Sequence, residues 1–379
     1  MAAGQLDRFS EYDTVQNRIV CFLLTFLLLL VFSGSLTGQD AQTINDVIQQ
    51  QVGKAKLYMQ FDGKEIHEAE QWHDEFHSKI NHLLGSTYPP QRWETVMVSG
   101  KKLEDHTRYE ILLKAKNVPD LPLYLLIPSD GVSRGRPAVV AIHGHGEYGH
   151  HSVAGRHDMQ GVSEAIEKAN YDYGLQFVRR GYVVVCPCLI PFGDRVDAAK
   201  YGSDPCAVTF VRMMAAGRVP LAENVRDIRW AVSFLQSRSE VDPKKIGCAG
   251  LSYGGRMTMM ATALDDRIQV AAISGALNLL QERTSLRYSC GLQIIPGLLK
   301  YGDYSEIGSL IAPRPVVWEM GDEDQLIVKN GWDEKFKNRL ERIYAAYEKP
   351  DNLHYDHFQG GHRWNGEVAF PLFDQVLKD

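Results

Sequence analysis

The fold is decided by the stretch Lys245-Ile246-Gly247-Cys248-Ala249-Gly250-Leu251-Ser252-Tyr253-Gly254, in which a strand-like run leads directly into a glycine–serine turn. A helix-like run, residues 256–261, follows the turn. A serine on a tight strand-to-helix turn has a strained backbone, and glycines two positions away on either side leave room for it. Such a turn exposes the hydroxyl and leaves the next backbone N–H free to donate. The pattern predicts a nucleophile elbow centred on Ser252.

Short apolar runs alternate with helical patterns on both sides of this turn. Continuous apolar strands separated by helices indicate a mostly parallel sheet that is covered on both faces, and right-handed crossovers make it a doubly wound α/β domain. Upstream, residues 95–98, 109–113 and 121–127 are strand-like and predict an antiparallel edge. The predicted parallel strands are residues 138–142, 182–186, 246–249, 270–273 and 316–320, and the clearest helices after residue 137 are 225–235, the run after Ser252, and 336–347.

The N-terminal part differs in texture from this domain. Residues 19–32 form an uncharged apolar run that is shorter than the roughly 20 residues of a membrane span and suits a secretory signal. Residues 1–18 lack the usual positive bias, and a start near Val15 would remove the acidic leader. We predict a signal peptide at residues 1–38, a helical extension at 39–90 and a catalytic domain at 91–379. The protein would be secreted or periplasmic, with a retained membrane anchor as the alternative.

Composition excludes some functions. The chain has 379 residues, of which 44% are hydrophobic and 23% charged, and its net charge is −6. This is ordinary globular composition, and it shows no basic footprint for nucleic acid. We therefore expect no nucleic-acid partner.

Two turns after predicted strands carry further candidate groups, since ligands of such a sheet gather at the carboxyl ends of its strands. His143-Gly144-His145-Gly146 follows the 138–142 strand, and an N–H of His145 or Gly144 would join that of Tyr253 in an oxyanion hole. Gly321-Asp322-Glu323-Asp324 follows the 316–320 strand. Asp324 is favoured to orient a histidine, while Asp322 and Glu323 suit solvated loop charges.

The candidate base lies near the C-terminus, in Gly360-Gly361-His362. Its two glycines allow the loop to curl back over the sheet. The pattern assigns His354 and His357, the nearby alternatives, to the preceding strand or loop. The chain order Ser252, Asp324, His362 is the order of α/β-hydrolases.

Metal chemistry has weaker support. Cys21 lies in the predicted signal, which leaves five cysteines and no fully paired set, and no Cys-x-x-Cys pair indicates structural zinc. The histidine-rich region after the 138–142 strand invites a metal hypothesis but has no acidic partner at a known spacing. We predict no metal site. The histidines concerned are His143, His145, His150, His151 and His157.

Together these motifs resemble the α/β-hydrolase superfamily, in particular its secreted dienelactone-hydrolase-like and acetyl-xylan-esterase-like serine esterases. The resemblance runs from about Trp93 to the C-terminus, and it implies an α/β-hydrolase fold with an antiparallel N-terminal edge. It implies Ser252 as nucleophile, His362 as general base and then acid, and Asp324 as its orienter. Dienelactone hydrolases proper are expected to use cysteine, so Ser252 favours a simple ester.

We therefore predict a serine carboxylic-ester hydrolase that forms an acyl-enzyme, needs no cofactor, and acts on an acylated carbohydrate or another small ester. The oxyanion would be held by the N–H groups of Tyr253 and His145. The alternatives are a prolyl-oligopeptidase-like peptidase and a noncatalytic binding protein of the same fold. Residues 279–309 are expected to form a lid. Candidate wall residues are Tyr288, Leu292 and Tyr301 from the lid, with Glu147, Asp194, Arg195 and Trp364 from elsewhere.

Overall fold

The computed structural model describes residues 42–379, except 197–203, 287–288 and 328–330. The chain divides into two units, Met1–Gln51 and Val52–Asp379. Helix α2 (Ile44–Gly53) begins in the first unit and buries none of its residues. The predicted signal peptide, residues 1–38, lies outside the described residues. Within the described ranges, no helix combines the length and the apolar character that crossing a membrane requires.

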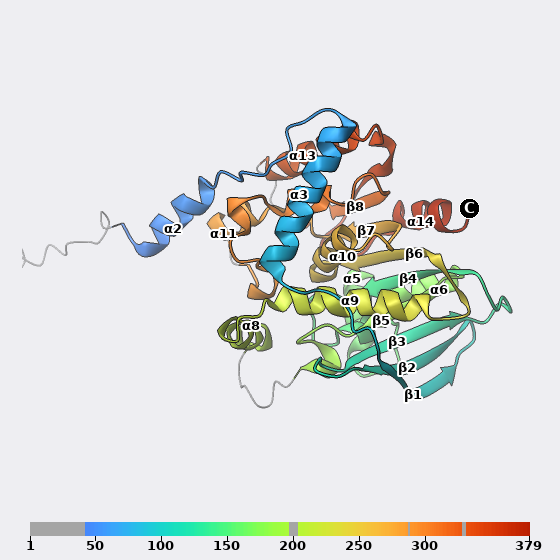
Figure 1. The fold of residues 1–379 in the computed structure, drawn as a ribbon. Helices are drawn as coiled ribbons and strands as arrows, with labels where there is room; N and C mark the ends of the chain where they lie inside the picture. The colour runs from blue at the N-terminus through green and yellow to red at the C-terminus, as the bar shows by residue number, and fades with distance from the viewer. Residues whose placement is uncertain (1–41, 197–203, 287–288, 328–330) are drawn as a thin grey trace, which may run out of the picture. The chain divides into compact units, whose positions relative to one another are not determined.

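One mixed sheet organises the second unit, and its described strands run in the order β1-β2-β3-β5-β4-β6-β7-β8-β9 (Figure 1). β1 to β3 and the β3–β5 pair are antiparallel, whereas every pair from β5 to β9 is parallel. The predicted α/β class and its antiparallel edge are confirmed. The strands are β1 (Glu94–Lys102), β2 (His106–Lys114), β3 (Leu121–Pro128), β4 (Arg136–Ile142), β5 (Val183–Pro187), β6 (Val241–Leu251), β7 (Val270–Ser274), β8 (Val316–Gly321) and β9 (Leu353–Phe358).

The two faces of the sheet carry separate cores, because successive side chains of a strand point to opposite faces. In β4, Ala138 and Val140 belong to one hydrophobic cluster, while Val139 and Ala141 belong to the other. The first cluster joins the sheet to helices α3 (Ile66–Leu84), α9 (Pro220–Gln236), α10 (Tyr253–Leu264), α12 (Tyr304–Ser309) and α13 (Trp332–Ala346).

The second cluster lies under fewer helices. Tyr173, Phe177 and Phe373 contribute large buried rings to it. Its helices are α4 (His150–Val153), α6 (Tyr173–Arg179) and α14 (Ala369–Leu377). The remaining described helices are α5 (Val162–Ala169), α8 (Pro205–Ala215), α11 (Leu280–Leu286) and the short turns η1 (Gly193–Arg195), η2 (Gly291–Gln293), η3 (Leu298–Lys300) and η4 (Pro350–Asn352).

Helix α3 follows from its sequence. Glu65 and Glu68 form a capping box at its start, and an apolar stripe along it includes Trp72, Phe76 and Ile80. All three side chains are buried in the same cluster as α9 and α13. This helix of the predicted 39–90 extension therefore packs within the Val52–Asp379 unit.

Candidate active site

The elbow serine lies between the end of β6 and the start of α10. Ser252 has φ 65° and ψ −119°, a conformation that costs a non-glycine residue of the order of 1–3 kcal/mol. Its N–H donates to the Ser274 carbonyl at 2.8 Å, which fixes the turn against β7. A Cβ on Gly254 would lie 2.0 Å from the Ile142 carbonyl oxygen, so only glycine lets α10 start this close to β4.

A buried carboxylate meets a histidine at the end of β8. His362 Nδ1 lies 2.7 Å from Asp324 Oδ2, and Asp324 is only 2% exposed. The other carboxylate oxygen of Asp324 accepts the Leu326 N–H at 2.8 Å. His362 Nε2 is buried without a hydrogen-bond partner among the described residues. The pair therefore leaves one ring nitrogen open for proton transfer.

The acid turn also holds the histidine loop in place. Asp322 accepts the Gly360 N–H at 2.9 Å, and the Glu323 N–H donates to the Gly360 carbonyl at 2.9 Å. Sequence reasoning treated Asp322 as a solvated charge, whereas it braces this loop. The alternative bases His354 and His357 lie on β9, the strand before the histidine loop, and His357 Nε2 contacts Lys337 Nζ at 3.0 Å.

The serine turn and the histidine ring meet at the end of β7. Gly275 has φ +60°, and a Cβ on it would lie 2.6 Å from His362 Cε1. Its neighbour Ser274 supplies the carbonyl that accepts the Ser252 N–H. The structure thus brings Ser252, Asp324 and His362 to neighbouring strand ends.

The loop after β4 offers two candidate N–H donors for the oxyanion hole, and only one of them is free of a hydrogen-bond partner within the described residues. The Gly144 N–H donates to the Tyr171 hydroxyl at 2.5 Å, whereas no partner is found for the His145 N–H among the described residues. Tyr253 begins α10, so its N–H has no partner within that helix. Sequence reasoning did not identify Tyr171, because it lies well downstream of the loop it holds.

His143 holds this loop in place through contacts of both its ring nitrogens. Its Nε2 accepts the Leu189 N–H at 2.9 Å, and its Nδ1 lies 2.8 Å from the Gly144 carbonyl. Burial lowers the pKa of His143 to about 3, so the ring is neutral. It acts as a structural hydrogen-bonding group.

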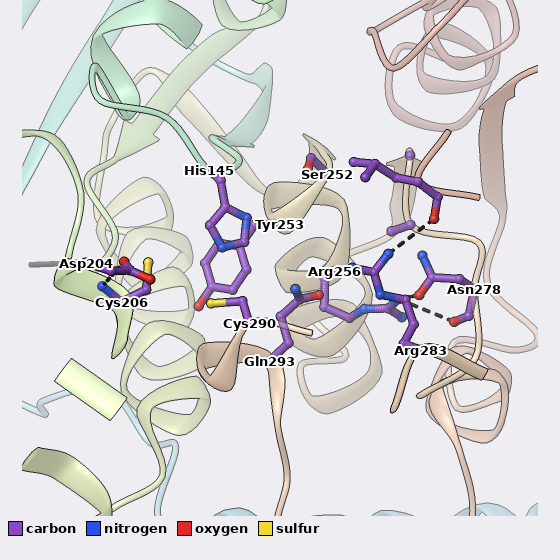
Figure 2. A pocket seen from close by; sticks show the side chains of 13 residues that line it. His145, Asp204, Cys206, Ser252, Tyr253, Arg256, Asn278, Arg283, Cys290 and Gln293 are labelled. Atoms are coloured by element: carbon purple, nitrogen blue, oxygen red, sulfur yellow. Dashed lines mark hydrogen bonds between the residues drawn. The ribbon is translucent and has the colours of Figure 1, made fainter. Parts of the chain in front are cut away.

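A cavity of about 360 Å³ opens beside Ser252 (Figure 2). Arg256 lies at its wall, where its Nη2 donates to Asn278 Oδ1 at 2.8 Å and its guanidinium stacks on Tyr304, 3.6 Å from the ring centroid. Burial lowers the pKa of Arg256 to about 10. The lining residues are His145, Asp204, Cys206, Ser252, Tyr253, Arg256, Gly275, Ala276, Asn278, Arg283, Cys290, Gln293 and Leu326.

The predicted lid contributes Arg283, Cys290 and Gln293 to this cavity, but the predicted wall residues are wrong where the structure describes them. Their side chains are buried, paired or exposed elsewhere, which a sequence pattern cannot reveal. Tyr288 lies outside the described residues. Leu292 is buried in the core, Tyr301 lies under Lys79, Trp364 stacks on Tyr173, Asp194 meets two histidines, Arg195 pairs with Asp227, and Glu147 is exposed.

Two groups of side chains in the described part of the chain are spaced to hold a metal ion. One is His150, His151 and Asp194, away from the cavity, where hydrogen bonds to the two histidines lower the pKa of the Asp194 carboxyl. The other is His145, Cys206 and Cys290 inside it. The neighbouring Cys206 and His145 side chains lower the pKa of the Cys290 thiol, while the Cys290 sulfur raises that of Cys206.

The strand order and the serine elbow define an α/β-hydrolase. The chain belongs to the dienelactone hydrolase family, whose sequence model matches residues 153–293. A relative from Bacillus subtilis (strain 168), provisionally named hydrolase YtaP, is 33% identical over 222 residues, which are 57% of this chain and 69% of YtaP. Membership of this family makes the chain a carboxylic ester hydrolase and confirms the predicted reaction class.

Several solved structures with this fold are named esterases. A provisionally named acetyl xylan esterase from Bacteroides fragilis NCTC 9343 matches with a TM-score of 0.70 and 18% identity, over 83% of this chain and 82% of that chain. A glucuronoyl esterase from Solibacter usitatus matches with a TM-score of 0.58 and 14% identity, over 82% and 93% of the two chains. At these identities the similarity establishes the fold.

Proposed function

We propose that this protein is a serine esterase in which Ser252 is the nucleophile. Ser252 Oγ attacks the ester carbonyl carbon while His362 Nε2 takes its proton, and that proton then passes to the departing alcohol. Asp324 orients the ring, and the N–H groups of Tyr253 and His145 hold the oxyanion. Water then attacks the acyl carbon as His362 Nε2 takes its proton; the bond to Ser252 Oγ breaks, the acid is released, and His362 returns the proton to Ser252 Oγ. No step needs a cofactor.

The observation that carries this proposal is the His362–Asp324 contact at 2.7 Å beside a free, buried Nε2. With Nδ1–H donating to Asp324, Nε2 carries the free lone pair that accepts a proton. Here the open nitrogen belongs to a ring packed on Gly275, directly after the residue that accepts the Ser252 N–H. This placement supports His362 as the general base for Ser252.

The substrate we propose is an acylated carbohydrate or another small ester. A cavity of about 360 Å³ accommodates a small acyl group with part of its alcohol. Arg256 and Asn278 supply polar groups at its wall, which suits a substrate rich in hydroxyls. The names of the structural neighbours, an acetyl xylan esterase and a glucuronoyl esterase, are in keeping with this class.

Replacing Ser252 with alanine tests the proposal. We expect Ser252→Ala to lower kcat/KM for p-nitrophenyl esters and acetylated xylan by about 1,000-fold or more, because the nucleophile is lost. Ser163→Ala, on α5 outside the cavity lining, is the matched control and should keep wild-type turnover. Unchanged ester turnover in Ser252→Ala would refute the assignment. A proline-containing peptide belongs in the panel, since hydrolysis of that substrate alone would favour the peptidase alternative.

For the N-terminus we propose a signal peptide at residues 1–38 and export of the remainder. The apolar run at 19–32 and its polar flank support this proposal. N-terminal sequencing of the native mature protein should give a terminus near residue 39. A terminus upstream of Ile19 would contradict cleavage and favour a retained anchor.

A further inference from the structure

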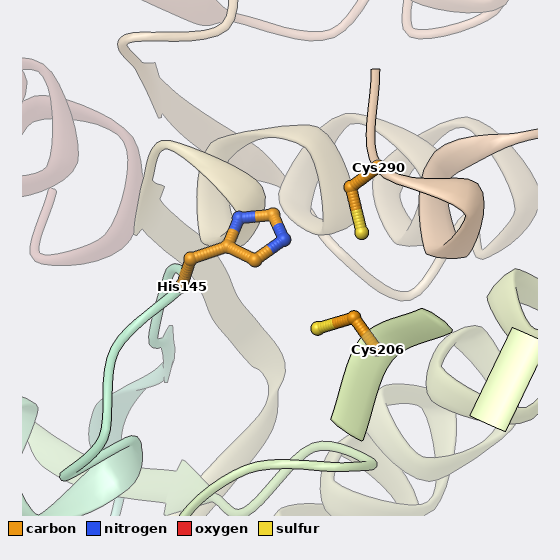
Figure 3. A group of neighbouring side chains, drawn as sticks. All are labelled: His145, Cys206 and Cys290. Carbon is orange, nitrogen blue, oxygen red and sulfur yellow. The ribbon is translucent and has the colours of Figure 1, made fainter. Parts of the chain in front are cut away.

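The side chains of His145, Cys206 and Cys290 converge in the cavity beside Ser252 (Figure 3). Their donor atoms, one ring nitrogen and two sulfurs, all lie within 4.8 Å of one another. Around a tetrahedral zinc ion, bond lengths of about 2.0–2.3 Å place such atoms roughly 3.5–3.8 Å apart. Each pair of donors therefore needs to approach by about 1.3 Å at most.

Packing holds each donor in this arrangement. The His145 ring packs against both Phe192 and Tyr253, at centroid distances of 5.5 and 4.9 Å. Cys206 is in the first turn of α8, where its N–H donates to the N-cap side chain of Asp204 at 2.9 Å. Because these contacts already restrict the two residues, a bound ion would lose little binding free energy in ordering them.

Cys290 is buried directly before η2, and α8 packs tightly on that turn. Its carbonyl accepts the Gln293 N–H at 3.0 Å. A Cβ on Gly291 would lie 2.6 Å from the ring of Phe210, which belongs to α8. The two cysteines are thus brought together by the contact between α8 and η2.

We propose that His145, Cys206 and Cys290 form a binding site for a zinc-like divalent cation, which controls access to Ser252. Two thiolates and an imidazole are soft donors that select zinc over magnesium or calcium. Three protein ligands leave a fourth position open toward the cavity, since His145 is exposed. The three donors come from segments far apart in the chain, so no spacing motif in the sequence predicts them.

The effect on catalysis rests on the proposed esterase function, whereas binding of the ion does not. The site shares its cavity with Ser252, and the backbone of His145 is a proposed oxyanion donor. A bound ion ties His145 to α8 and η2 and fills part of the cavity. Complete loss of an oxyanion donor costs about 100-fold or more. Because the ion shifts the His145 N–H without removing it, we expect kcat/KM for p-nitrophenyl acetate to fall by about 10-fold or more.

The binding test uses the full chain, reduced, freed of metal with a chelator and kept anaerobic. Titration with Co²⁺ should reach one ion per chain, with a sulfur-to-cobalt charge-transfer band and the visible bands of tetrahedral cobalt. Zn²⁺ should displace the cobalt, and Mg²⁺ should not. Absence of these bands, or saturation without sulfur ligation, would overturn the site. A Cys206–Cys290 disulfide in the purified protein, with no cobalt binding after its reduction, would equally overturn it.

Variants separate this site from other donors. Cys206→Ser, Cys290→Ser and His145→Ala should each weaken metal binding by about 100-fold or more, because losing even an outer partner of a ligand costs about 10–100-fold. Cys186→Ala, which removes a buried thiol outside the group, is the matched control and should bind normally. His145 is exposed, so its replacement keeps the test valid if a cysteine variant fails to fold.

Activity then distinguishes the two proposals. Zn²⁺ should inhibit wild-type turnover, a chelator should restore it, and Cys206→Ser should resist inhibition. If one ion binds per chain but turnover is not inhibited, the proposed control of access to Ser252 is wrong, whereas the metal site itself is confirmed. If the metal-free wild type hydrolyses no ester, the proposed function fails, while the cobalt titration still decides the site.

Discussion

At the scale of residues, the site depends on which partner each ring or carboxylate meets. Asp324 is buried and faces His362, whereas Glu323 in the same turn is exposed. A buried carboxylate of this kind holds the imidazole in one tautomer and stabilises its charged form. Asp322 acts one step further out, through its bond to the Gly360 N–H.

Asp324→Asn should lower kcat for p-nitrophenyl acetate by about 1,000- to 10,000-fold, because an amide favours the wrong histidine tautomer. The measurement is kcat across the pH range, in which the variant should also alter the shape of the profile. Glu323→Gln is the matched control and should retain the wild-type profile. Equal losses in both variants would contradict an orienting role for Asp324.

At the scale of elements, the elbow depends on how closely α10 approaches the end of β4. Gly254 is the point of contact, and a Cβ there would meet both the Ile142 carbonyl oxygen at 2.0 Å and the His143 carbonyl carbon at 2.8 Å. Backbone cannot give way as a flexible side chain can. An added methyl group must therefore push the helix from the strand and shift Ser252 with it.

Gly254→Ala should lower the free energy of unfolding by about 1–3 kcal/mol, the usual cost of overpacking, and lower ester turnover as well. Urea unfolding followed by circular dichroism measures the first effect. Gly53→Ala is the control, since a Cβ at Gly53 meets nothing within 4 Å. If both variants unfold at the wild-type midpoint, the close approach of α10 and β4 does not limit which residue position 254 can hold.

At the scale of the whole molecule, a buried acid ties the sheet to the C-terminal loop. Glu319 on β8 accepts the Gly366 N–H at 2.8 Å, in the loop that carries His362. Burial raises the pKa of Glu319 from 4.5 to about 7, and Asp356 adds to the rise. Between those values the folded chain holds more protons than the unfolded chain, so the free energy of unfolding falls as pH rises.

Glu319→Gln removes this titration while keeping a carbonyl oxygen for Gly366. The stability of the variant relative to wild type should therefore increase as pH rises from about 4.5 to 7, by up to the order of 3 kcal/mol. Urea unfolding at a series of pH values measures the difference. Glu306, whose pKa burial also raises to about 7, is present in both proteins and cancels. Parallel stability curves would show that Glu319 does not titrate in this range.

Local pattern was sufficient for much of the fold. The elbow, the acid turn and the histidine loop all stand at strand ends, as their sequences predict, because each depends on residues close together in the chain. β9 was not identified as a strand, since Leu353–Phe358 mixes polar and apolar residues without the continuous apolar run of its neighbours. Amphipathic helices such as α5 and α14 were missed as well, because they are short.

By itself, the sequence determined the α/β-hydrolase class and the order of Ser252, Asp324 and His362, since apolar runs and glycine turns are local properties. Only the tertiary structure decided which side chains line the cavity, that Tyr171 occupies the Gly144 N–H, and that His145 meets Cys206 and Cys290. Those contacts join segments far apart in the chain. They are set by how helices pack across the strand ends, and no spacing within the sequence encodes that packing.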